Sequence, residues 1–125
     1  MLEQFRVNLD EAEMVHGEEL GKTVANIFQK LGVPPEDAKL GADVLVLADL
    51  RGVDTHGVSN MLKSYITGYQ NGQINPRPDW KIVRESPSTA TIDSDRGLGT
   101  IITPKAMDIA IEKAKNVGLG MVTIG

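Results

Sequence analysis

The 125-residue sequence contains no cysteine, only two histidines and 4% aromatic residues. Without cysteine, a disulfide framework, a thiolate nucleophile and a zinc ribbon are all excluded. No apolar run approaches the length of about 18 residues that could span a bilayer, and the N-terminus lacks the basic-then-apolar order of a signal peptide. We therefore expect a cytoplasmic protein with no membrane partner.

The charge balance restricts the partners further. The chain has 13 lysines and arginines against 17 aspartates and glutamates, which gives a formal net charge of -4 at pH 7. The basic residues form no stripe, so nucleic acid is not expected as a partner. With 41% hydrophobic residues, the chain is long enough for one ordinary globular domain.

The apolar pattern predicts an alternation of helices and strands after a first segment, residues 1–15, that has no clean period. Helices are predicted at residues 20–31, 34–48, 57–70 and 103–117, and short strands at 80–83, 89–92 and 121–124. Residues 44–48 are apolar on every side, so we expect this part of the second helix to be buried on most faces. The fourth helix is predicted to open at Thr103-Pro104, and its apolar face is formed by Met107, Ala110, Ile111, Ala114 and Val117.

The order of these elements indicates the fold class. A strand, a glycine loop, a helix and a second strand form the pattern of a crossover unit, whose strands normally belong to a larger covered sheet. We expect an α/β protein in which residues 1–75 form an N-terminal helical subdomain. Residues 76–125 would be the incomplete beginning of an α/β domain, so the sequence reads as the front part of something longer.

Residues 49–58, Asp-Leu-Arg-Gly-Val-Asp-Thr-His-Gly-Val, are the most informative segment for function. Imidazole changes charge between about pH 5 and 8, which makes His56 the best candidate for proton chemistry. If a helix begins near His56, the residues His56, Asn60 and Lys63 share the face opposite its apolar side. We therefore expect an exposed catalytic or binding histidine, with a core or helix-capping histidine as the alternative.

Other candidate sites are less complete. Asp54 and His56 resemble a pair of metal ligands, but no further His and no Cys lies nearby, so no metal site is predicted. Gly97-Leu98-Gly99 could be the start of a dinucleotide-binding loop with the pattern G-x-G-x-x-G. The position of the third glycine is occupied by Ile102, however, so the pattern is incomplete. We favour a tight turn into the helix. Arg51 could reach an anionic ligand beside His56, or be a solvated cation at a helix end.

Two acidic residues and the other histidine are given structural roles. Asp93 and Asp95 are predicted to be turn residues rather than catalytic partners. His16 precedes the first helix, where a surface or capping role is expected.

Residues 48–58 resemble the N-terminal signature of the malate/L-lactate dehydrogenase family, which is distinct from the classical Rossmann dehydrogenases and includes sulfolactate and ureidoglycolate dehydrogenases. Residues 72–76, 97–107 and 110–118 also match, in the right order, so the resemblance covers nearly the whole chain from about Gly17 onward. It implies a non-Rossmann, sulfolactate dehydrogenase-like fold and a homodimer. It also implies NAD or NADP as the cofactor, with most of the cofactor site beyond residue 125.

The resemblance also implies roles for individual residues. His56, preceded by Thr55, would exchange a proton with the oxygen of a small anionic 2-hydroxy or 2-oxo acid, and Thr55 would orient the ring or the substrate. Relatives commonly carry an arginine where this sequence has Asn60. The substrate-binding candidates are therefore Arg51, Asn60 and Lys63, and no cofactor-binding residue is assigned.

A non-catalytic binding or assembly protein derived from this enzyme fold is the alternative, supported by the early end of the sequence and by Asn60. For residues 1–125 alone we expect no dehydrogenase activity, no tight NAD(H) binding and a tendency to oligomerise. The reason is that helix faces and strand edges suited to burial would meet water.

Overall fold

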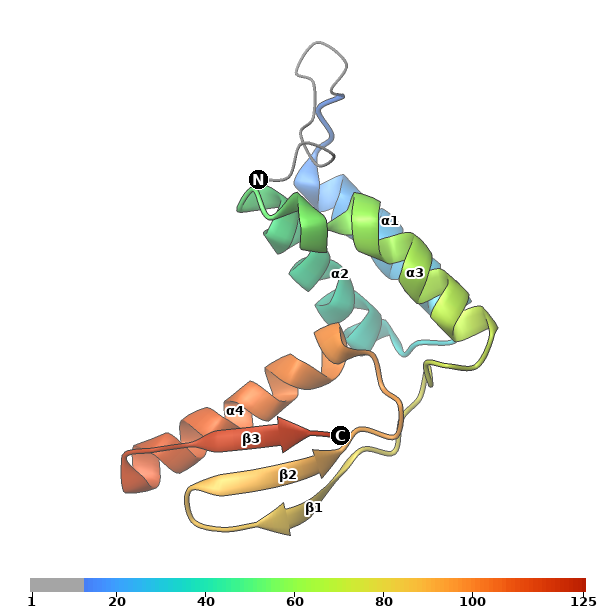
Figure 1. Ribbon diagram of the computed structural model, residues 1–125. Helices are drawn as coiled ribbons and strands as arrows, with labels where there is room; N and C mark the ends of the chain where they lie inside the picture. Colours follow the sequence, from blue (N-terminus) through green and yellow to red (C-terminus); the bar gives the residue numbers. More distant parts are fainter. Residues whose placement is uncertain (1–12) are drawn as a thin grey trace. The chain divides into compact units, whose positions relative to one another are not determined.

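The computed structural model describes residues 13–125, and the chain forms two compact units (Figure 1). The first unit ends at Thr67 and is helical, whereas the second begins at Gly68 and combines a three-stranded sheet with a long helix. The predicted order of a helical part followed by a mixed sheet-and-helix part is therefore confirmed. A domain division at residues 75 and 76 stays a prediction about the protein as a whole.

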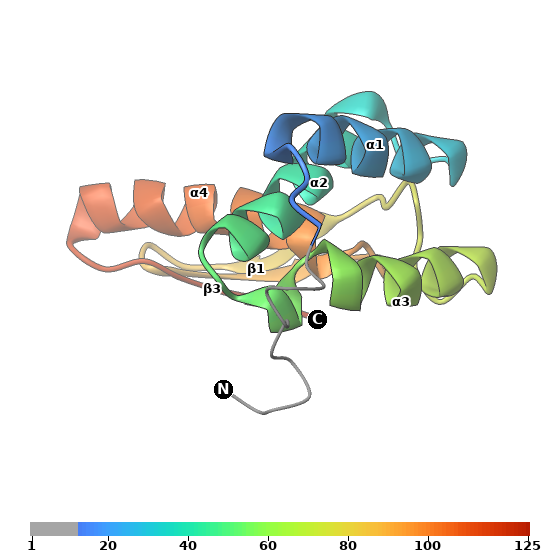
Figure 2. The same cartoon turned by 90° about the horizontal axis from the view of Figure 1, so that it is seen from above.

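Helices α1 (Gly17–Lys30) and α2 (Pro35–Leu50) pack against each other in the first unit (Figures 1 and 2). Pro35 occupies the start of α2 and acidic residues fill its first turn, as predicted, because proline suits the first helical position and carboxylates complement the helix dipole. Phe28 of α1 and Leu45 of α2 are fully buried. Burial of each such side chain contributes about 1.5–3 kcal/mol.

The later half of α2 is covered on most faces, as predicted. Leu45 and Val46 are buried and Val44 is half-buried, but Leu47 is 50% exposed. The apolar segment at residues 44–48 therefore keeps one uncovered side among the described residues.

A short 3-10 turn, η2 (Asp54–His56), precedes helix α3 (Val58–Gln70). The predicted third helix is confirmed, but His56 lies in the turn before it. The helix face that we predicted for His56, Asn60 and Lys63 therefore does not describe the position of His56. Gly57, whose backbone is extended, interrupts the helical rotation between them.

The second unit contains the predicted crossover. Strands β1 (Lys81–Glu85) and β2 (Thr89–Asp93) form an antiparallel hairpin, and β3 (Met121–Ile124) pairs with β2 in parallel. Helix α4 (Gly99–Val117) connects β2 to β3 and lies on one side of the sheet (Figure 2). Ile92, Ile102 and Ala106 form the buried cluster between them, with Trp80 packed against it.

Helix α4 differs from the prediction in its start and in its buried face. It begins at Gly99, before Thr103-Pro104, because the N–H groups of Ile101 and Ile102 already donate to the Leu98 carbonyl oxygen. Its side chains against the core are Ile102, Ala106, Ile109 and Lys113. Met107, Ile111 and Val117 are instead about half exposed. Ala110 and Ala114 of the predicted face are half-buried, so the sheet covers the neighbouring side of the helix instead of this face.

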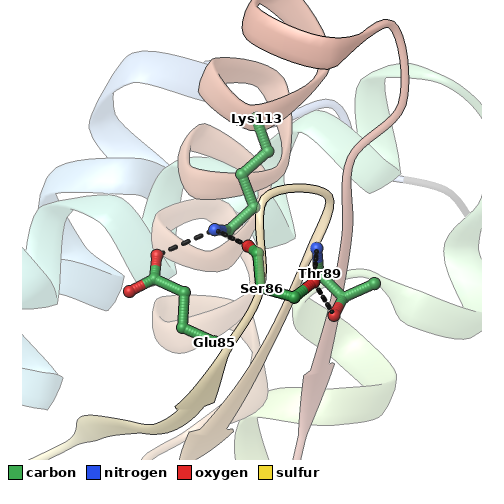
Figure 3. A network of polar contacts seen from close by, with 4 residues as sticks. All are labelled: Glu85, Ser86, Thr89 and Lys113. Carbon is green, nitrogen blue, oxygen red and sulfur yellow. Dashed lines mark hydrogen bonds and ion pairs between the residues drawn. The ribbon is translucent and has the colours of Figure 1, made fainter.

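Lys113 is the charged residue on the buried side of α4. Its Nζ donates to Glu85 Oε1 and to the carbonyl oxygen of Ser86, each at 2.8 Å (Figure 3). Ser86 Oγ in turn accepts the backbone N–H of Thr89 at 3.0 Å. The lysine therefore fastens α4 to the tight turn of the β1–β2 hairpin.

The loop before α4 contains the predicted tight turn, but Asp95 and Arg96 form it, with φ values of 48° and 60°, rather than the glycines. The N–H of Gly97 donates to the Ser94 carbonyl oxygen at 2.8 Å, and a Cβ on Gly97 would lie 2.8 Å from Ile102 Cγ1. Asp95 is a turn residue as predicted, whereas Asp93 is the last residue of β2 and its Oδ1 accepts the Asp95 N–H at 3.0 Å. Across residues 13–125, no helix combines the length and the hydropathy needed to cross a membrane.

Candidate active site

The end of α2 determines where the segment that carries His56 begins. Gly52 adopts a left-handed conformation with φ +69°, which glycine reaches without a steric penalty. The N–H of Val53 donates to the Ala48 carbonyl oxygen at 2.9 Å, and the N–H of Gly52 donates to that of Asp49 at 2.9 Å. This pair of bonds is a Schellman motif, which ends the helix and turns the chain sharply.

The η2 turn is closed by its own backbone and by one side chain. The His56 N–H donates to the Val53 carbonyl oxygen at 2.9 Å. The Asp54 carbonyl oxygen accepts both the Gly57 N–H, at 3.2 Å, and Nδ2 of Asn60, at 2.7 Å. The position of His56 is therefore linked to the first turn of α3 through Asn60.

The side chain of His56 is exposed, which confirms the expected exposure and contradicts the alternative of a core histidine. Thr55 Oγ1 lies 2.8 Å from Nδ1 of the ring, and this hydroxyl can donate or accept according to the tautomer. With Nδ1 engaged by Thr55, Nε2 is the ring atom suited to exchange a proton with a ligand. The arrangement can therefore support general acid–base chemistry.

Of the three predicted substrate-binding residues, Asn60 is bonded to the η2 turn, whereas Arg51 and Lys63 are not in the part of the chain that the structure describes. Asn60 is exposed, and its amide is bonded to the Asp54 carbonyl oxygen. Arg51 caps the C-terminus of α2, and Lys63 lies on α3; both are exposed. Within residues 13–125, neither side chain is bonded to the η2 turn. The structure thus joins Thr55, His56 and Asn60 in one bonded segment, with Arg51 and Lys63 on the flanking helices.

Asp49 is a residue that the sequence reasoning did not single out. Its Oδ2 accepts the N–H of Val58, the first residue of α3, at 2.9 Å. An aspartate so far ahead of a helix gives no local capping signal, because capping residues are recognised immediately before the first turn.

A large apolar groove lies elsewhere in the first unit, between α1 and α2. It has a volume of about 930 Å³ and is lined by residues that include Gly21, Val46, Leu47 and Leu50. None of residues 51–63 lines it, so the groove is separate from the His56 site.

The second histidine and the acidic residues add no other site. His16 is exposed at the N-cap position of α1 and its side chain makes no capping bond, which agrees with the predicted surface role. Among the residues that the structure describes, no group of three or more histidines and carboxylates could hold a metal ion.

Comparison with known proteins places this geometry in a family. The model of the malate/L-lactate dehydrogenase family matches residues 15–125. The chain belongs to this family. The fold and the family that residues 48–58 indicated are therefore confirmed.

Curated relatives and solved structures of this family cover most of the chain. L-sulfolactate dehydrogenase of Methanocaldococcus jannaschii is 54% identical over 101 residues, which are 81% of this chain and 29% of that protein. Malate dehydrogenase of Pyrococcus abyssi is 49% identical over 107 residues, 86% of this chain and 29% of that protein. The structure of malate dehydrogenase from Pyrococcus horikoshii OT3 has a TM-score of 0.89 at 44% identity, over 95% of this chain and 34% of that one. The chain thus spans about a third of the length of these relatives.

Proposed function

We propose that this protein is an NAD- or NADP-dependent oxidoreductase that interconverts a 2-hydroxy acid and its 2-oxo acid, with His56 as proton donor and acceptor. The observation that carries the proposal is the exposed His56 ring, held at Nδ1 by Thr55 at 2.8 Å within an ordered turn. Membership of a dehydrogenase family supports the reaction class. Lactate, malate and sulfolactate are the substrates that the names of the family and of its members suggest.

In the direction of reduction, His56 begins as the imidazolium. Its Nε2–H donates to the carbonyl oxygen at C2 of the 2-oxo acid, and this proton passes to that oxygen; the hydride at C2 is what the nicotinamide cofactor would supply. The products are the 2-hydroxy acid and neutral His56, and oxidation runs through the same steps in reverse. Proton transfer by a positioned side chain typically contributes about 10²- to 10⁴-fold in rate.

Thr55 is suited to both protonation states of the ring. When Nδ1 carries a proton, the Thr55 hydroxyl oxygen accepts a hydrogen bond from the Nδ1–H group. Nε2 is then the ring nitrogen that gains and loses the reacting proton. The role proposed for Thr55 is therefore to fix the ring orientation and the tautomer.

The nicotinamide cofactor would supply the hydride, but Gly97 of this chain offers no open backbone position for its pyrophosphate. A Cβ on Gly97 would meet Ile102 Cγ1 at 2.8 Å and Pro78 Cγ at 2.9 Å, so the glycine is packed against side chains. An open backbone cradle is what a phosphate-binding glycine loop provides. We therefore assign no cofactor contact to this loop.

The carboxylate of the substrate needs a cationic partner. A guanidinium or ammonium group bonded to a carboxylate is among the stronger polar contacts in proteins. Asn60 is neutral and its amide already serves the Asp54 carbonyl oxygen, so Arg51 and Lys63 are the proposed partners, with Asn60 in a lesser role.

The activity is tested by assaying the protein, at the length of its relatives, for NAD- and NADP-linked oxidation of lactate, malate and sulfolactate. Propane-1,2-diol is the matched control for lactate, because it keeps the secondary alcohol and lacks the carboxylate. We expect turnover with at least one of the acids and none with the diol. No turnover with any of these acids under either cofactor would contradict the proposal.

We further propose a cytoplasmic homodimer for the whole protein. Met107, Ile111, Met121 and Ile124 are each at least 40% exposed in the second unit, which supports association through apolar surface. Residues 1–125 alone are accordingly proposed to be inactive, to bind NADH weakly and to self-associate. An NADH fluorescence titration and light scattering test these points, and a monomer that binds NADH at micromolar concentration would contradict them.

A further inference from the structure

We propose that Asp49 is a positioning residue for His56: its carboxylate holds the junction between η2 and α3 and thereby the backbone that carries the imidazole. The inference rests on the proposed role of His56 as proton donor and acceptor. Asp49 itself would contact neither substrate nor cofactor.

The first observation is a bond across the turn. Asp49 lies in the last turn of α2, and its Oδ2 accepts the N–H of Val58, where α3 begins, at 2.9 Å. The first N–H groups of a helix have no partner within the helix, and a negative charge there is favoured by the helix dipole. One carboxylate thus joins the end of α2 to the start of α3, with η2 between them.

The second observation is the lack of space at Gly57. A Cβ on this residue would lie 1.5 Å from Asp49 Oδ1 and 2.3 Å from Asp49 Cγ. Gly57 is buried and directly follows His56 in the chain. The carboxylate therefore packs on the backbone next to the catalytic candidate, and any side chain at Gly57 must displace it.

The third observation is that η2 is fixed from its other end as well. The Asp54 carbonyl oxygen accepts Asn60 Nδ2 at 2.7 Å, so the turn is bonded to α3 by a second side chain. Loss of the Asp49 contact would leave the segment between Asp54 and Val58 with the Asn60 bond and with the bond from the Met61 N–H to the Gly57 carbonyl oxygen, but without the side chain that joins it to α2. A displacement of about 1 Å at a reacting group can cost about 10²-fold in rate.

The test compares four variants and one control variant of the protein at the length of its relatives, with kcat and KM measured for the acid that it turns over fastest. Asp49→Ala removes the acceptor, whereas Asp49→Asn keeps an oxygen that can accept from Val58. Gly57→Ala forces the carboxylate away, and the double variant Asp49→Ala/Gly57→Ala removes the clash. Gly99→Ala is the matched glycine control, because nothing lies within 4 Å of a Cβ at that position.

We expect Asp49→Ala and Gly57→Ala each to lower kcat by roughly 10- to 100-fold, with KM changed by less than about threefold. Asp49→Asn should restore most of the turnover. Adding Gly57→Ala to Asp49→Ala should lower kcat by less than about twofold more, because the two changes disturb one contact. Gly99→Ala should leave kcat unchanged.

A merely structural role would lower the thermal unfolding temperature and leave kcat per folded enzyme at the wild-type value. That result for both Asp49→Ala and Gly57→Ala overturns this inference alone, provided that His56→Ala has lost turnover. If His56→Ala keeps wild-type turnover, the proposed function and this inference both fail. If the loss of kcat in the double variant equals the combined losses of the two single variants, the claim that Asp49 and Gly57 act through one contact is also overturned.

Discussion

Thr55 Oγ1 lies 2.8 Å from Nδ1 of His56, and both residues belong to the same 3-10 turn. A hydroxyl can donate to an unprotonated ring nitrogen or accept from a protonated one. The contact can therefore persist while the ring gains or loses a proton at Nε2.

Replacing Thr55 by Val removes the hydroxyl and keeps the shape of the side chain. A hydrogen bond to a charged group contributes about 1.5–3 kcal/mol, so we expect kcat to fall by at least about tenfold. Thr55→Ser keeps the hydroxyl and should retain most of the turnover. Steady-state kinetics of the two variants decide the matter, and equal kcat values for them would show that the hydroxyl has no role.

Lys63→Met and Arg51→Met test whether either cationic side chain binds the substrate carboxylate. If either cation binds the carboxylate equally in the ground state and the transition state, its loss raises KM by about tenfold or more and leaves kcat unchanged. Lys30→Met, at an exposed lysine in the last turn of α1, is the control. Normal KM values in both test variants would place the carboxylate elsewhere.

Lys113→Ala should destabilise the second unit. The lysine side chain is only 11% exposed, and its removal leaves the Ser86 carbonyl oxygen without this donor and takes away a packed aliphatic stem. We expect a loss of about 1–3 kcal/mol in the free energy of unfolding. Urea unfolding followed by the fluorescence of Trp80, which packs against the Ile92 cluster, measures this loss.

Two neighbouring variants give this experiment its controls. Glu85→Ala should cost less than Lys113→Ala, because the Glu85 side chain is 57% exposed and the Lys113 ammonium keeps the Ser86 carbonyl oxygen as an acceptor. Lys115→Ala, at a side chain that is 65% exposed, should cost at most about 1 kcal/mol, since exposed ion pairs contribute little. A loss in Lys113→Ala no larger than in Lys115→Ala would mean that the buried contact does not stabilise the unit.

Local signals in the sequence predicted most of the elements. Pro35 and the acids after it indicated the start of α2, because these residues act on their own backbone and helix end. A tight turn was predicted near Gly97 and Gly99, but Asp95 and Arg96 form it, and Gly97 is packed against Ile102. The strands flanking the turn at residues 86–88 were also found by composition. The parallel pairing of β3 with β2 followed from the strand, helix and strand order.

Two features that the sequence did not predict, the buried side of α4 and the role of Asp49, depend on contacts between residues far apart in the chain. The sheet covers the Ile102 and Lys113 side of α4 and leaves Met107 and Ile111 exposed, and no helical period reveals which side a partner will cover. The start of α4 was missed for a local reason, because the Leu98 carbonyl oxygen begins the helix before Pro104. Asp49 escaped notice because its partner Val58 lies nine residues along the chain and beyond a turn.

The candidate site was found through a motif and one chemically distinctive residue. His56 stands out because imidazole is suited to proton transfer near neutral pH, and its exposure agrees with the prediction. The bond from Asn60 to the Asp54 carbonyl oxygen could not be foreseen, because it depends on Gly57 separating η2 from α3.

The central claim is that His56 exchanges the proton in the reaction, and His56→Ala measured beside His16→Ala tests it most directly. The two changes remove the same side chain, and His16 is exposed at the N-cap of α1 with no capping bond from its ring. We predict that His56→Ala lowers kcat for the preferred acid by about 10²- to 10⁴-fold while the protein stays folded by circular dichroism. His16→Ala should keep wild-type turnover. Wild-type turnover in His56→Ala, or an equal loss in both variants, would contradict the account.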